Sequence, residues 1–380
     1  MRALFLSANV GVGHTSAANA LRAALAHGDP PFEATVVDSY KYAASVVSRV
    51  VSEGYLRMVK TIPQMYRFLY NRAELATEVG PFRAWVHQFT ATNLRPLLQE
   101  LRPDVVICTH AFPCGVMAEY KKQFADAPPV MGVVTDFVVH AFWIHNNIEG
   151  YAVATPEMRA TLIARGVPRD RILVSGIPVH AEFSQQQSDR NTLRERLGLP
   201  LDRSTVLLMG GGLGIGPLEA MMHALDRVRT PLCALAIVGR SARSEQRVLE
   251  YAHRVGYPVR VVRFVNNVHD YMHASDLLIT KPGGLTSAEA LVAQVPMVLF
   301  KPLPGQEERN TRYLVQRRAA LRAKSTADLT RTVESLLESG EKRDTMRAAM
   351  AKLGKPDAAA QVAAAIRALA AGGAQGEEIA

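Results

Sequence analysis

A histidine stands near the start of the chain, where a buried strand gives way to a helix. The run ALFLS (3–7) is apolar and predicts the strand, and Thr15 opens a stretch with helical character. The glycine-rich turn NVGVG (9–13) separates the two and leads directly to His14. An imidazole with an ordinary pKa of about 6.5 takes up a proton near neutral pH, which suits a general base. His14 is therefore a candidate catalytic base, and the alternative is a helix-capping or otherwise structural histidine.

A carboxylate and further histidines follow other apolar runs in the first half of the chain. Asp136 comes directly after PVMGVVT (129–135), and it can orient His14 or act as the base itself. A single histidine after a strand is more often structural than catalytic, so the remaining ones are weaker candidates. These are His110, His140 and His145.

A second glycine-rich turn, GGGLGIG (210–216), lies in the middle of the chain. It follows the apolar run TVLLMG (205–210) and precedes PLEAMMHAL, which predicts a helix. Glycines let a ligand approach the backbone, and a helix N-terminus attracts anions such as a diphosphate. The alternative is a purely steric need for glycine in a tight turn. The turn is not a P-loop, because no Gly-Lys-Ser/Thr follows it, and the next strand ends in Gly-Arg, without the acidic ribose ligand of a nicotinamide site.

The most informative stretch is SDLLITKPGGLTSAEALVAQVPMVLFKPLPGQEERN (275–310). It predicts a strand, a Pro-Gly-Gly turn, and a helix capped by Thr286 or Ser287 with Glu289 in its first turn. Ligands bind at the carboxyl ends of strands in open α/β sheets, so Glu289 can hold two ribose hydroxyls. The alternative is an acid that compensates the helix dipole. A second polar cluster follows the strand PMVLF and can read the hydroxyls of a sugar; it consists of Gln306, Glu307 and Asn310.

Eleven short apolar runs alternate with stretches of helical character, and these elements must position the candidate residues. The runs are 3–7, 34–38, 104–108, 129–135, 150–154, 172–176, 205–210, 232–239, 259–264, 276–280 and 296–300. Strands that are apolar along their whole length are buried on both faces by helices, so the pattern predicts parallel α/β sheets. There are too many strands for one small sheet, and they fall into two groups.

The boundary between the groups is the polar stretch SQQQSDRNT (184–192), after which the pattern of strand, glycine-rich turn and helix restarts. We therefore expect an N-terminal α/β domain over residues 1–183 and a second α/β domain over 184–356. An alanine-rich helix and a tail occupy 357–380.

One segment, at about 40–95, interrupts the alternation. It contains no good strand and predicts helices rich in aromatic and basic residues. One interpretation is a helical insertion that packs its own apolar face. The other is a surface that touches anionic lipid and accepts an acyl chain. The residues that the second interpretation singles out are Arg57, Lys60, Tyr66 and Arg67.

The composition is that of a globular protein with a basic excess. The chain has 380 residues, of which 48% are hydrophobic and 21% charged, and its formal net charge is +9. Such an excess favours an acidic partner, either a nucleotide or an anionic membrane surface. The charge is spread along the chain without a recognised nucleic-acid module, so we expect no nucleic-acid partner. Three scattered cysteines fit a reducing compartment, and we expect neither a secretory signal nor a membrane span.

The motifs together resemble those of the monogalactosyldiacylglycerol synthase and processive diacylglycerol glucosyltransferase family, a relative of the MurG-type transferases. The resemblance covers about residues 3 to 355. It is carried by GVGHTSAA, by VVTDFVVHAFWIHNNIEGYAVATPEM with the GIPVH after it, by GGGLGIGP, and by KPGGLTSAEAL with PGQEERN. The first turn has Val10 and Val12 where the family usually has more glycine. The resemblance implies two facing Rossmann-like domains of the GT-B type, with the active site in the cleft between them.

The resemblance also implies a role for each matching residue. The implied donor site comprises Gly211, Gly212, Leu213 and Gly214 at the diphosphate, Arg240, Phe264 and Val265 beside the uracil and phosphate, Gly284, Leu285 and Thr286 along the nucleotide, Glu289 at the ribose, and Gln306, Glu307 and Asn310 at the hexose. On the acceptor side it implies His14 as the base with Asp136 as the second candidate, and Gly13, His140 and Trp143 near the acceptor.

The implied activity is an inverting transfer of a hexose from UDP-glucose or UDP-galactose to diacylglycerol, which forms a β-glycosyl diacylglycerol. The enzyme would be cytoplasmic and peripheral, on the inner face of the cell membrane, with an anionic lipid surface as its partner. No Asp-x-Asp metal motif occurs, so a helix dipole and a basic residue are expected to stabilise the leaving diphosphate without a metal or another cofactor. The alternatives are a MurG-like transferase on another lipid acceptor, a UDP-sugar 2-epimerase and a non-catalytic nucleotide-binding or membrane-binding protein.

Overall fold

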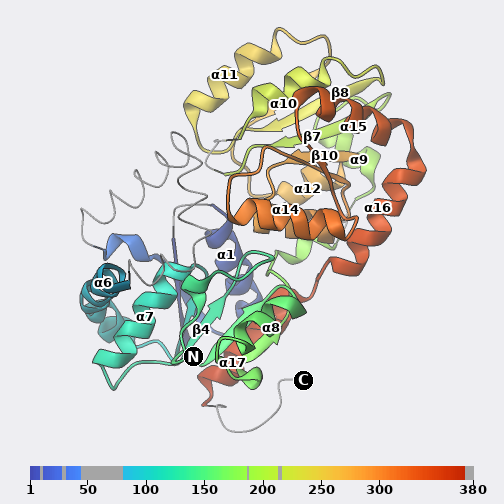
Figure 1. Ribbon diagram of the computed structural model, residues 1–380. Helices are drawn as coiled ribbons and strands as arrows, with labels where there is room; N and C mark the ends of the chain where they lie inside the picture. The colour runs from blue at the N-terminus through green and yellow to red at the C-terminus, as the bar shows by residue number, and fades with distance from the viewer. Residues whose placement is uncertain (9–11, 28–30, 44–79, 186–187, 213–215, 373–380) are drawn as a thin grey trace. The chain divides into compact units, whose positions relative to one another are not determined.

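The computed structural model describes residues 1–8, 12–27, 31–43, 80–185, 188–212 and 216–372. It divides into two compact units (Figure 1). The first unit contains Met1–His180, Pro304–Gln306 and Asp357–Ala380, and the second contains Ala181–Leu303 and Glu307–Pro356. The chain therefore leaves the first unit after its last strand and returns to it for its last helix.

A parallel sheet of six strands forms the centre of the first unit. In spatial order the strands are β2 (Glu33–Asp38), β1 (Arg2–Ser7), β3 (Val105–Cys108), β4 (Val130–Val133), β5 (Gly150–Val153) and β6 (Ile172–Val174). Strand β1 pairs with β2 on one side and with β3 on the other, and the later strands follow beyond β3 in chain order. The carboxyl ends of β1 and β3 thus flank a topological switch point, which is where open α/β sheets bind ligands.

The second unit repeats this plan with its own parallel sheet of six strands. In spatial order they are β12 (Leu321–Ala323), β11 (Met297–Phe300), β10 (Leu277–Thr280), β7 (Ser204–Met209), β8 (Leu232–Ile237) and β9 (Val259–Val262). Here the order reverses between β7 and β10, so their carboxyl ends flank the switch point of this sheet.

Helices connect the strands in both units. In the first unit they are α1 (Val12–Ala26), η1 (Ser39–Lys41), α6 (Gly80–Leu101), α7 (Ala111–Gln123), η3 (Ala141–Trp143), α8 (Pro156–Ile163), η4 (Arg169–Arg171) and α17 (Ala358–Ala370). In the second they are η5 (Ala181–Phe183), α9 (Arg190–Arg196), α10 (Leu218–Leu225), α11 (Ala242–Ala252), α12 (Val268–His273), α13 (Gly284–Ala293), α14 (Gln306–Gln316), α15 (Thr326–Glu338) and α16 (Gly340–Leu353).

All eleven strands expected from the apolar runs are confirmed, each with its ends within a few residues of the run. Among the described residues the sheets contain one further strand, β12, which the sequence pattern missed. Its three residues lie at the edge of the second sheet, and Leu321 is 40% exposed. An edge strand of this length is half solvated and needs no continuous apolar run, so it has little signal.

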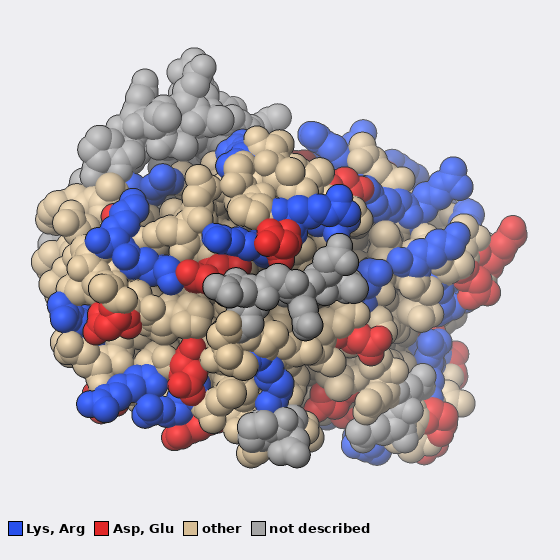
Figure 2. Space-filling model, turned by 90° about the horizontal axis from the view of Figure 1, so that it is seen from below, with Lys and Arg blue, Asp and Glu red and all other residues tan. Residues whose placement is uncertain are grey.

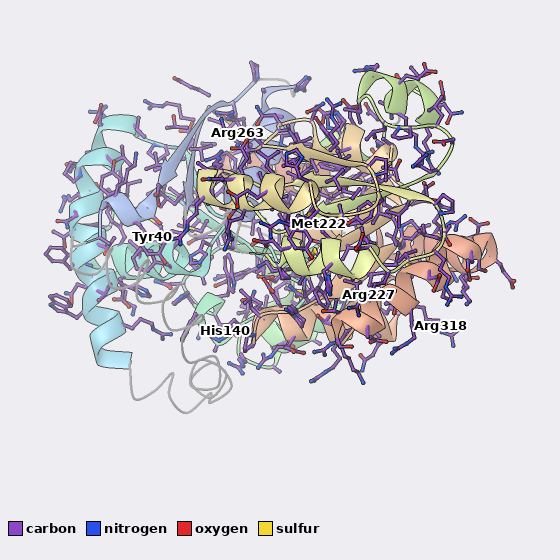
Figure 3. All side chains as sticks on the ribbon, turned by 90° about the horizontal axis from the view of Figure 1, so that it is seen from above. Tyr40, His140, Met222, Arg227, Arg263 and Arg318 are labelled. Atoms are coloured by element: carbon purple, nitrogen blue, oxygen red, sulfur yellow. The ribbon has the colours of Figure 1, made fainter. Side chains whose placement is uncertain are left out.

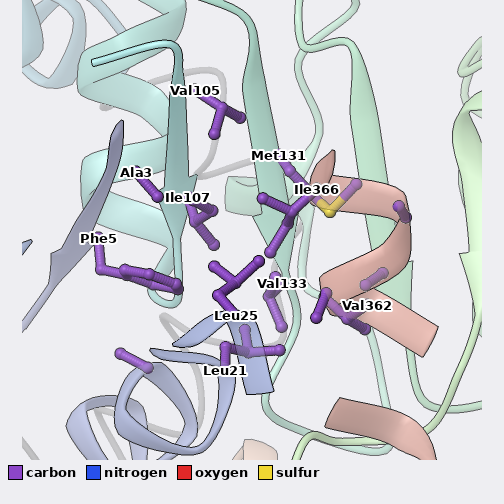
Figure 4. Close-up of a cluster of buried hydrophobic side chains, with 14 of the residues drawn as sticks. Ala3, Phe5, Leu21, Leu25, Val105, Ile107, Met131, Val133, Val362 and Ile366 are labelled. Atoms are coloured by element: carbon purple, nitrogen blue, oxygen red, sulfur yellow. The ribbon is translucent and has the colours of Figure 1, made fainter. Parts of the chain in front are cut away.

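The core of the first unit joins the N-terminal strands and helix to the last helix of the chain. Phe5, Leu21 and Leu25 pack with Val362 and Ile366 of α17 in one buried cluster (Figure 4). The guanidinium of Arg367 also donates a 2.6 Å hydrogen bond to the carbonyl of Leu25. The alanine-rich helix expected near residues 357–371 is therefore confirmed, and its burial against α1 explains its small side chains.

Two helix starts differ from those expected. Helix α1 begins at Val12, so His14 lies within its first turn and not in the glycine-rich turn before it. Helix α13 begins at Gly284 after a Gly283 cap that has no side chain to bond, so Thr286 and Ser287 do not cap it. Both helices begin earlier than the sequence suggested, because glycine in a first turn costs little once the turn is supported by packing.

The loop expected over residues 184–192 ends earlier than predicted. Helix α9 begins at Arg190, where the Asp189 carboxylate accepts hydrogen bonds from the backbone N–H groups of Asn191 and Thr192. The sequence signal for this cap was an aspartate directly before the helix.

In the segment at 40–95 the structure describes the end of η1 with the two residues after it, and α6 from Gly80 onward. Residues 44–79 lie outside the described residues, and with them Arg57, Lys60, Tyr66 and Arg67. Of the helices that the structure describes, none combines the length and the apolar character that a membrane span requires.

Candidate functional site

The carboxyl ends of three neighbouring strands bring polar side chains together in the first unit. His14 follows β1 on α1, Thr109 follows β3, and Thr135 and Asp136 follow β4. Tyr40 of η1, which follows β2, is labelled in Figure 3; its ring centroid lies 6.2 Å from that of His110 and 4.6 Å from that of Phe112, on which it stacks. The sequence separations reach 121 residues, so only the parallel sheet brings these groups to one edge.

The hydrogen bonds of His14 define its tautomer. Its Nδ1 lies 3.0 Å from the carbonyl oxygen of Thr109 and 2.8 Å from the Oγ1 of Thr135. A carbonyl oxygen only accepts, so Nδ1 carries the hydrogen and donates it. The lone pair of the ring is then on Nε2, which is the atom that can take a proton from a substrate.

Desolvation keeps His14 neutral. It lowers the pKa of His14 to about 4, and the hydrogen bond to Thr109 opposes only part of this effect. The ring is half-buried and stands edge-on to His110, with the two centroids 4.7 Å apart. At neutral pH the ring is therefore an unprotonated base held in one orientation.

Asp136 directly follows Thr135, but it is not one of the two groups that hold the Nδ1 of His14. The single Nδ1 hydrogen of His14 is shared between the Thr109 carbonyl and the Thr135 hydroxyl, so these two groups hold this nitrogen. Asp136 itself is half-buried at the carboxyl end of β4. Thr109 and Thr135 carry no local sequence signal, because a threonine after a strand is common and only the fold shows which ones face a histidine.

The other histidines of this unit serve the backbone. The Nδ1 of His110 accepts from the N–H of Phe112 and caps α7, and that of His140 accepts from the N–H of Phe142 and caps η3. The Nε2 of His145 donates to the carbonyl of Phe142. The structural alternative for these three residues is therefore supported by their contacts.

The short turn after His140 places two adjacent aromatic residues differently. Trp143 is only 3% exposed and packs in the interior of the first unit. The exposed aromatic residue of this turn is Phe142, at 41%. Sequence alone could not choose between two adjacent aromatic residues in a short 3-10 helix.

In the second unit the glycine-rich turn after β7 folds tightly on itself. The N–H of Gly216 donates to the carbonyl of Gly210 over 2.9 Å, and a Cβ on Gly216 would stand 2.2 Å from the Cα of Gly210. Gly211 has a φ of +84°, which other residues rarely adopt. The steric need for glycine is thus real at these positions, although Leu213 and Gly214 lie outside the described residues.

The next strand adds a cation beside this turn. The N–H of Arg240 donates to the carbonyl of Gly212 over 3.3 Å, so the end of β8 is tied to the glycine-rich turn. Its guanidinium lies 4.2 Å from the ring centroid of Phe264, which follows β9, and Val265 beside it is half-buried. The structure therefore brings together Arg240, Phe264 and Gly212, three residues expected at the donor site.

Glu289 is a buried carboxyl group without a partner among the described residues. It is 6% exposed and lies in the second turn of α13, not the first, so it is poorly placed to compensate the helix dipole. Burial raises the pKa of Glu289 to about 8, and no described group opposes this rise. Gly284, Leu285 and Thr286 precede it on the same helix, and the buried Ser287 hydroxyl also has no partner in the described structure. Unpaired buried polar groups at a ligand-binding edge are typical of a binding site.

The cluster after β11 lies in the first turns of α14. Both Glu307 oxygens are engaged, Oε1 with the Lys281 Nζ at 2.9 Å and Oε2 with the N–H of Leu303 at 2.7 Å. Asn310 is fully buried and donates to the carbonyl of Pro282 over 3.0 Å, so it ties α14 to the Pro-Gly-Gly turn. Gln306 is the first residue of α14 and is half-buried.

Within the described ranges there is no group of three or more His, Cys, Asp and Glu side chains arranged to hold a metal ion.

Solved structures of low sequence identity share this fold. The chain is similar to MurG of Acinetobacter baumannii, with a TM-score of 0.61, 16% identity and coverage of 96% of this chain and 99% of that one. It is also similar to the UDP-GlcNAc 2-epimerase of Neisseria meningitidis bound to UDP-GlcNAc, with a TM-score of 0.58, 12% identity and coverage of 97% and 99%. Two α/β units with parallel sheets are the GT-B architecture, and identities this low show the fold alone.

Sequence comparison is more specific. Residues 14–179 match the monogalactosyldiacylglycerol (MGDG) synthase model, and residues 205–362 match the glycosyltransferase family 28 C-terminal domain. The processive diacylglycerol beta-glucosyltransferase of Bacillus cytotoxicus is 30% identical over 363 residues, which cover 95% of this chain and 92% of that protein. The chain therefore belongs to the glycosyltransferase family of monogalactosyldiacylglycerol synthases and processive diacylglycerol glucosyltransferases.

Proposed function

We propose that this protein transfers a hexose from a UDP-sugar to diacylglycerol and releases UDP, forming a β-glycosyl diacylglycerol. The relationship to processive diacylglycerol beta-glucosyltransferases over nearly the whole of both chains is the observation that carries the proposal. Glucose is the first donor sugar to test because of these relatives, and galactose is the second because of the MGDG synthase model.

The chemical step needs a base for the acceptor hydroxyl. In the proposed reaction the hydroxyl proton passes to the Nε2 of His14 while the oxygen attacks the anomeric carbon. The bond from that carbon to the diphosphate oxygen breaks, and its electron pair leaves with UDP. One displacement inverts the anomeric centre. The Nδ1 hydrogen bonds to Thr109 and Thr135 support this role, since they leave Nε2 as the basic atom.

The donor is proposed to bind along the carboxyl edge of the second sheet. The glycine-rich turn and Arg240 receive the diphosphate, with Phe264 and Val265 at the uracil. Glu289 receives the ribose hydroxyls, which give a buried carboxyl group the hydrogen bonds that it lacks in the described structure. Gln306 and Glu307 hold the hexose. Asn310 supports them because its hydrogen bond to Pro282 ties α14 to the Pro-Gly-Gly turn.

Charge on the leaving diphosphate is proposed to be stabilised without a metal ion. The N-terminus of α10 and the Arg240 guanidinium supply positive potential, and the sequence has no Asp-x-Asp motif. We expect turnover to be unchanged after treatment with EDTA and by added Mg²⁺ or Mn²⁺. A loss with EDTA that a divalent ion restores would contradict this part of the proposal.

The acceptor lies in a membrane, so the protein is proposed to be peripheral on the cytoplasmic face of an anionic membrane. The net charge of +9 favours such a surface, and Lys and Arg side chains are spread over the face shown in Figure 2. Helix α6 exposes Trp85 at 53% and Phe89 at 41%, stacked one turn apart with centroids separated by 5.9 Å. Tryptophan and phenylalanine are suited to the lipid interface.

The first experiment is turnover of UDP-glucose and UDP-galactose with diacylglycerol in anionic liposomes, with glycolipid and UDP both measured. Formation of glycosyl diacylglycerol supports the proposal and identifies the sugar. No glycolipid with either donor contradicts it. Epimerised sugar released from UDP-GlcNAc without an acceptor would indicate the 2-epimerase alternative, and transfer from UDP-GlcNAc only to a lipid-linked muropeptide would indicate the MurG-like alternative.

A further inference from the structure

Lys281, which is not among the residues expected at the donor site, lies against the glycine-rich turn. Lys281 directly follows β10, the neighbour of β7 in the second sheet. A Cβ placed on Gly211 would stand 3.6 Å from the Cε and 3.9 Å from the Nζ of Lys281. The ammonium group thus lies beside the backbone of Gly211, on the side that a side chain at this position would occupy.

Glu307 is the counter-ion of this lysine among the residues that the structure describes. The Nζ of Lys281 donates to the Oε1 of Glu307 over 2.9 Å, and Glu307 is itself held through the N–H of Leu303. The two side chains are only 15% and 16% exposed. Burying an ion pair costs desolvation energy that the attraction rarely exceeds, so this pair contributes little to stability by itself. An ammonium group has three hydrogens, and Glu307 uses one of them.

The next residues along the chain add a second source of positive potential. Helix α13 begins three residues after Lys281 at Gly284, and its Gly283 cap has no side chain to bond the first N–H groups. Ser287, in the same part of the helix, keeps a buried hydroxyl without a partner in the described structure. The carboxyl ends of β7 and β10 therefore bring together Lys281, the glycine-rich turn and the N-terminus of α13, whose first N–H groups have no side-chain cap.

We infer that Lys281 binds the diphosphate of the donor through the two ammonium hydrogens that Glu307 leaves, and that Glu307 is its positioning residue. The inference rests on the proposed function and adds a second cation to Arg240; Lys281 follows β10 and Arg240 follows β8, the two neighbours of β7 in the sheet. The same carboxylate can still accept a hexose hydroxyl, because its two oxygens offer about four acceptor positions. In this arrangement Lys281 contacts the diphosphate and Glu307 contacts the hexose, on the two sides of the bond that breaks.

The test is calorimetric titration of the full-length protein with UDP and with uridine, which lacks the phosphates. A charge-assisted hydrogen bond of this kind corresponds to roughly a 10- to 100-fold change in affinity. Lys281→Met should weaken UDP binding by that factor and leave uridine binding unchanged. The salt dependence of UDP binding should also become shallower, because one screened contact is lost.

The matched control is Arg322→Met. Arg322 pairs with Glu308, the neighbour of Glu307 on α14, at 2.9 Å, but on a more exposed surface. This variant should bind UDP and uridine as the wild type does. Lys281→Arg keeps the charge and should bind UDP more tightly than Lys281→Met, which provides a readout if the methionine variant folds poorly.

The outcomes separate this inference from the proposed function. Equal binding of UDP by wild type and Lys281→Met, or an equal loss for UDP and uridine, overturns the role of Lys281 and leaves the proposed function standing. A wild-type protein that binds neither ligand overturns both.

Discussion

His14 is the residue on which the proposed chemistry depends most directly. Its Nδ1 is held by Thr109 and Thr135, so the ring presents one basic nitrogen. We expect His14→Ala to lower kcat by roughly 100- to 10,000-fold, the usual contribution of a general base, while the affinity for UDP is unchanged. Steady-state turnover and UDP titration measure the two effects. Asp136→Asn is the comparison. If Asp136→Asn loses turnover and His14→Ala does not, the base is Asp136.

The low pKa of His14 predicts an unusual pH profile. Because burial lowers the pKa to about 4, the base is unprotonated from neutral pH down to the region of that value. We expect kcat at saturating UDP-sugar, where the donor already occupies Glu289, to change little between about pH 8 and 6 and to fall only as the pH approaches the pKa of His14. An acidic limb centred at about pH 6.5, the ordinary value for histidine, would contradict this prediction. Circular dichroism at each pH separates loss of the base from loss of the fold.

At the scale of the element, α6 presents a stacked aromatic pair, Trp85 and Phe89. We expect the double substitution Trp85→Ser and Phe89→Ser to weaken binding to anionic liposomes several-fold, since burial of each ring in the interface is lost. Co-sedimentation with liposomes measures the effect. Leu249→Ser on α11 is the control, because Leu249 is similarly exposed, at 42%, but lies in the second unit. Equal binding by the aromatic variant and the control would exclude α6 as a membrane contact.

The whole first unit carries a group of histidines that are neutral when folded. Desolvation lowers the pKa of His87 to about 3 and those of His14 and His145 to about 4, and it places the pKa of His110 well below its ordinary value. The ring of His87 packs tightly over Gly115 of α7, where a Cβ would stand 2.3 Å from its Cε1. These rings are therefore part of the packing and cannot take up protons without loss of stability.

The sign of the pH effect follows from these values. The unfolded chain binds protons at these histidines below about pH 6.5, whereas the folded chain does so only near the lowered pKa values. The free energy of unfolding should therefore fall as the pH decreases from 7 toward 4. Thermal unfolding at pH 7, 6 and 5 measures this, and His87→Gln should show a weaker dependence than the wild type. A melting temperature that stays constant or rises toward pH 5 would contradict the prediction.

Much of this molecule was predictable because its signals are local. Eleven strands follow from apolar runs, since a strand buried on both faces needs such a run wherever it stands. The glycine-rich turn after β7 and the carboxyl group of Glu289 were visible for the same reason, as residue types at fixed distances from a strand. The short edge strand β12 and the start of α13 were not, because their signals are weak or depend on packing.

The sequence by itself determined the alternation of strands and helices, the family and the residues able to do chemistry. Only the tertiary structure decided which of these residues have partners: Thr109 and Thr135 at His14, Lys281 at Gly211 and Glu307, and no described group at Glu289. It also decided that Phe142 is exposed and Trp143 buried. The physical reason is that hydrogen bonds, ion pairs and burial depend on groups far apart in the chain, which meet only where parallel strands bring their carboxyl ends to one edge.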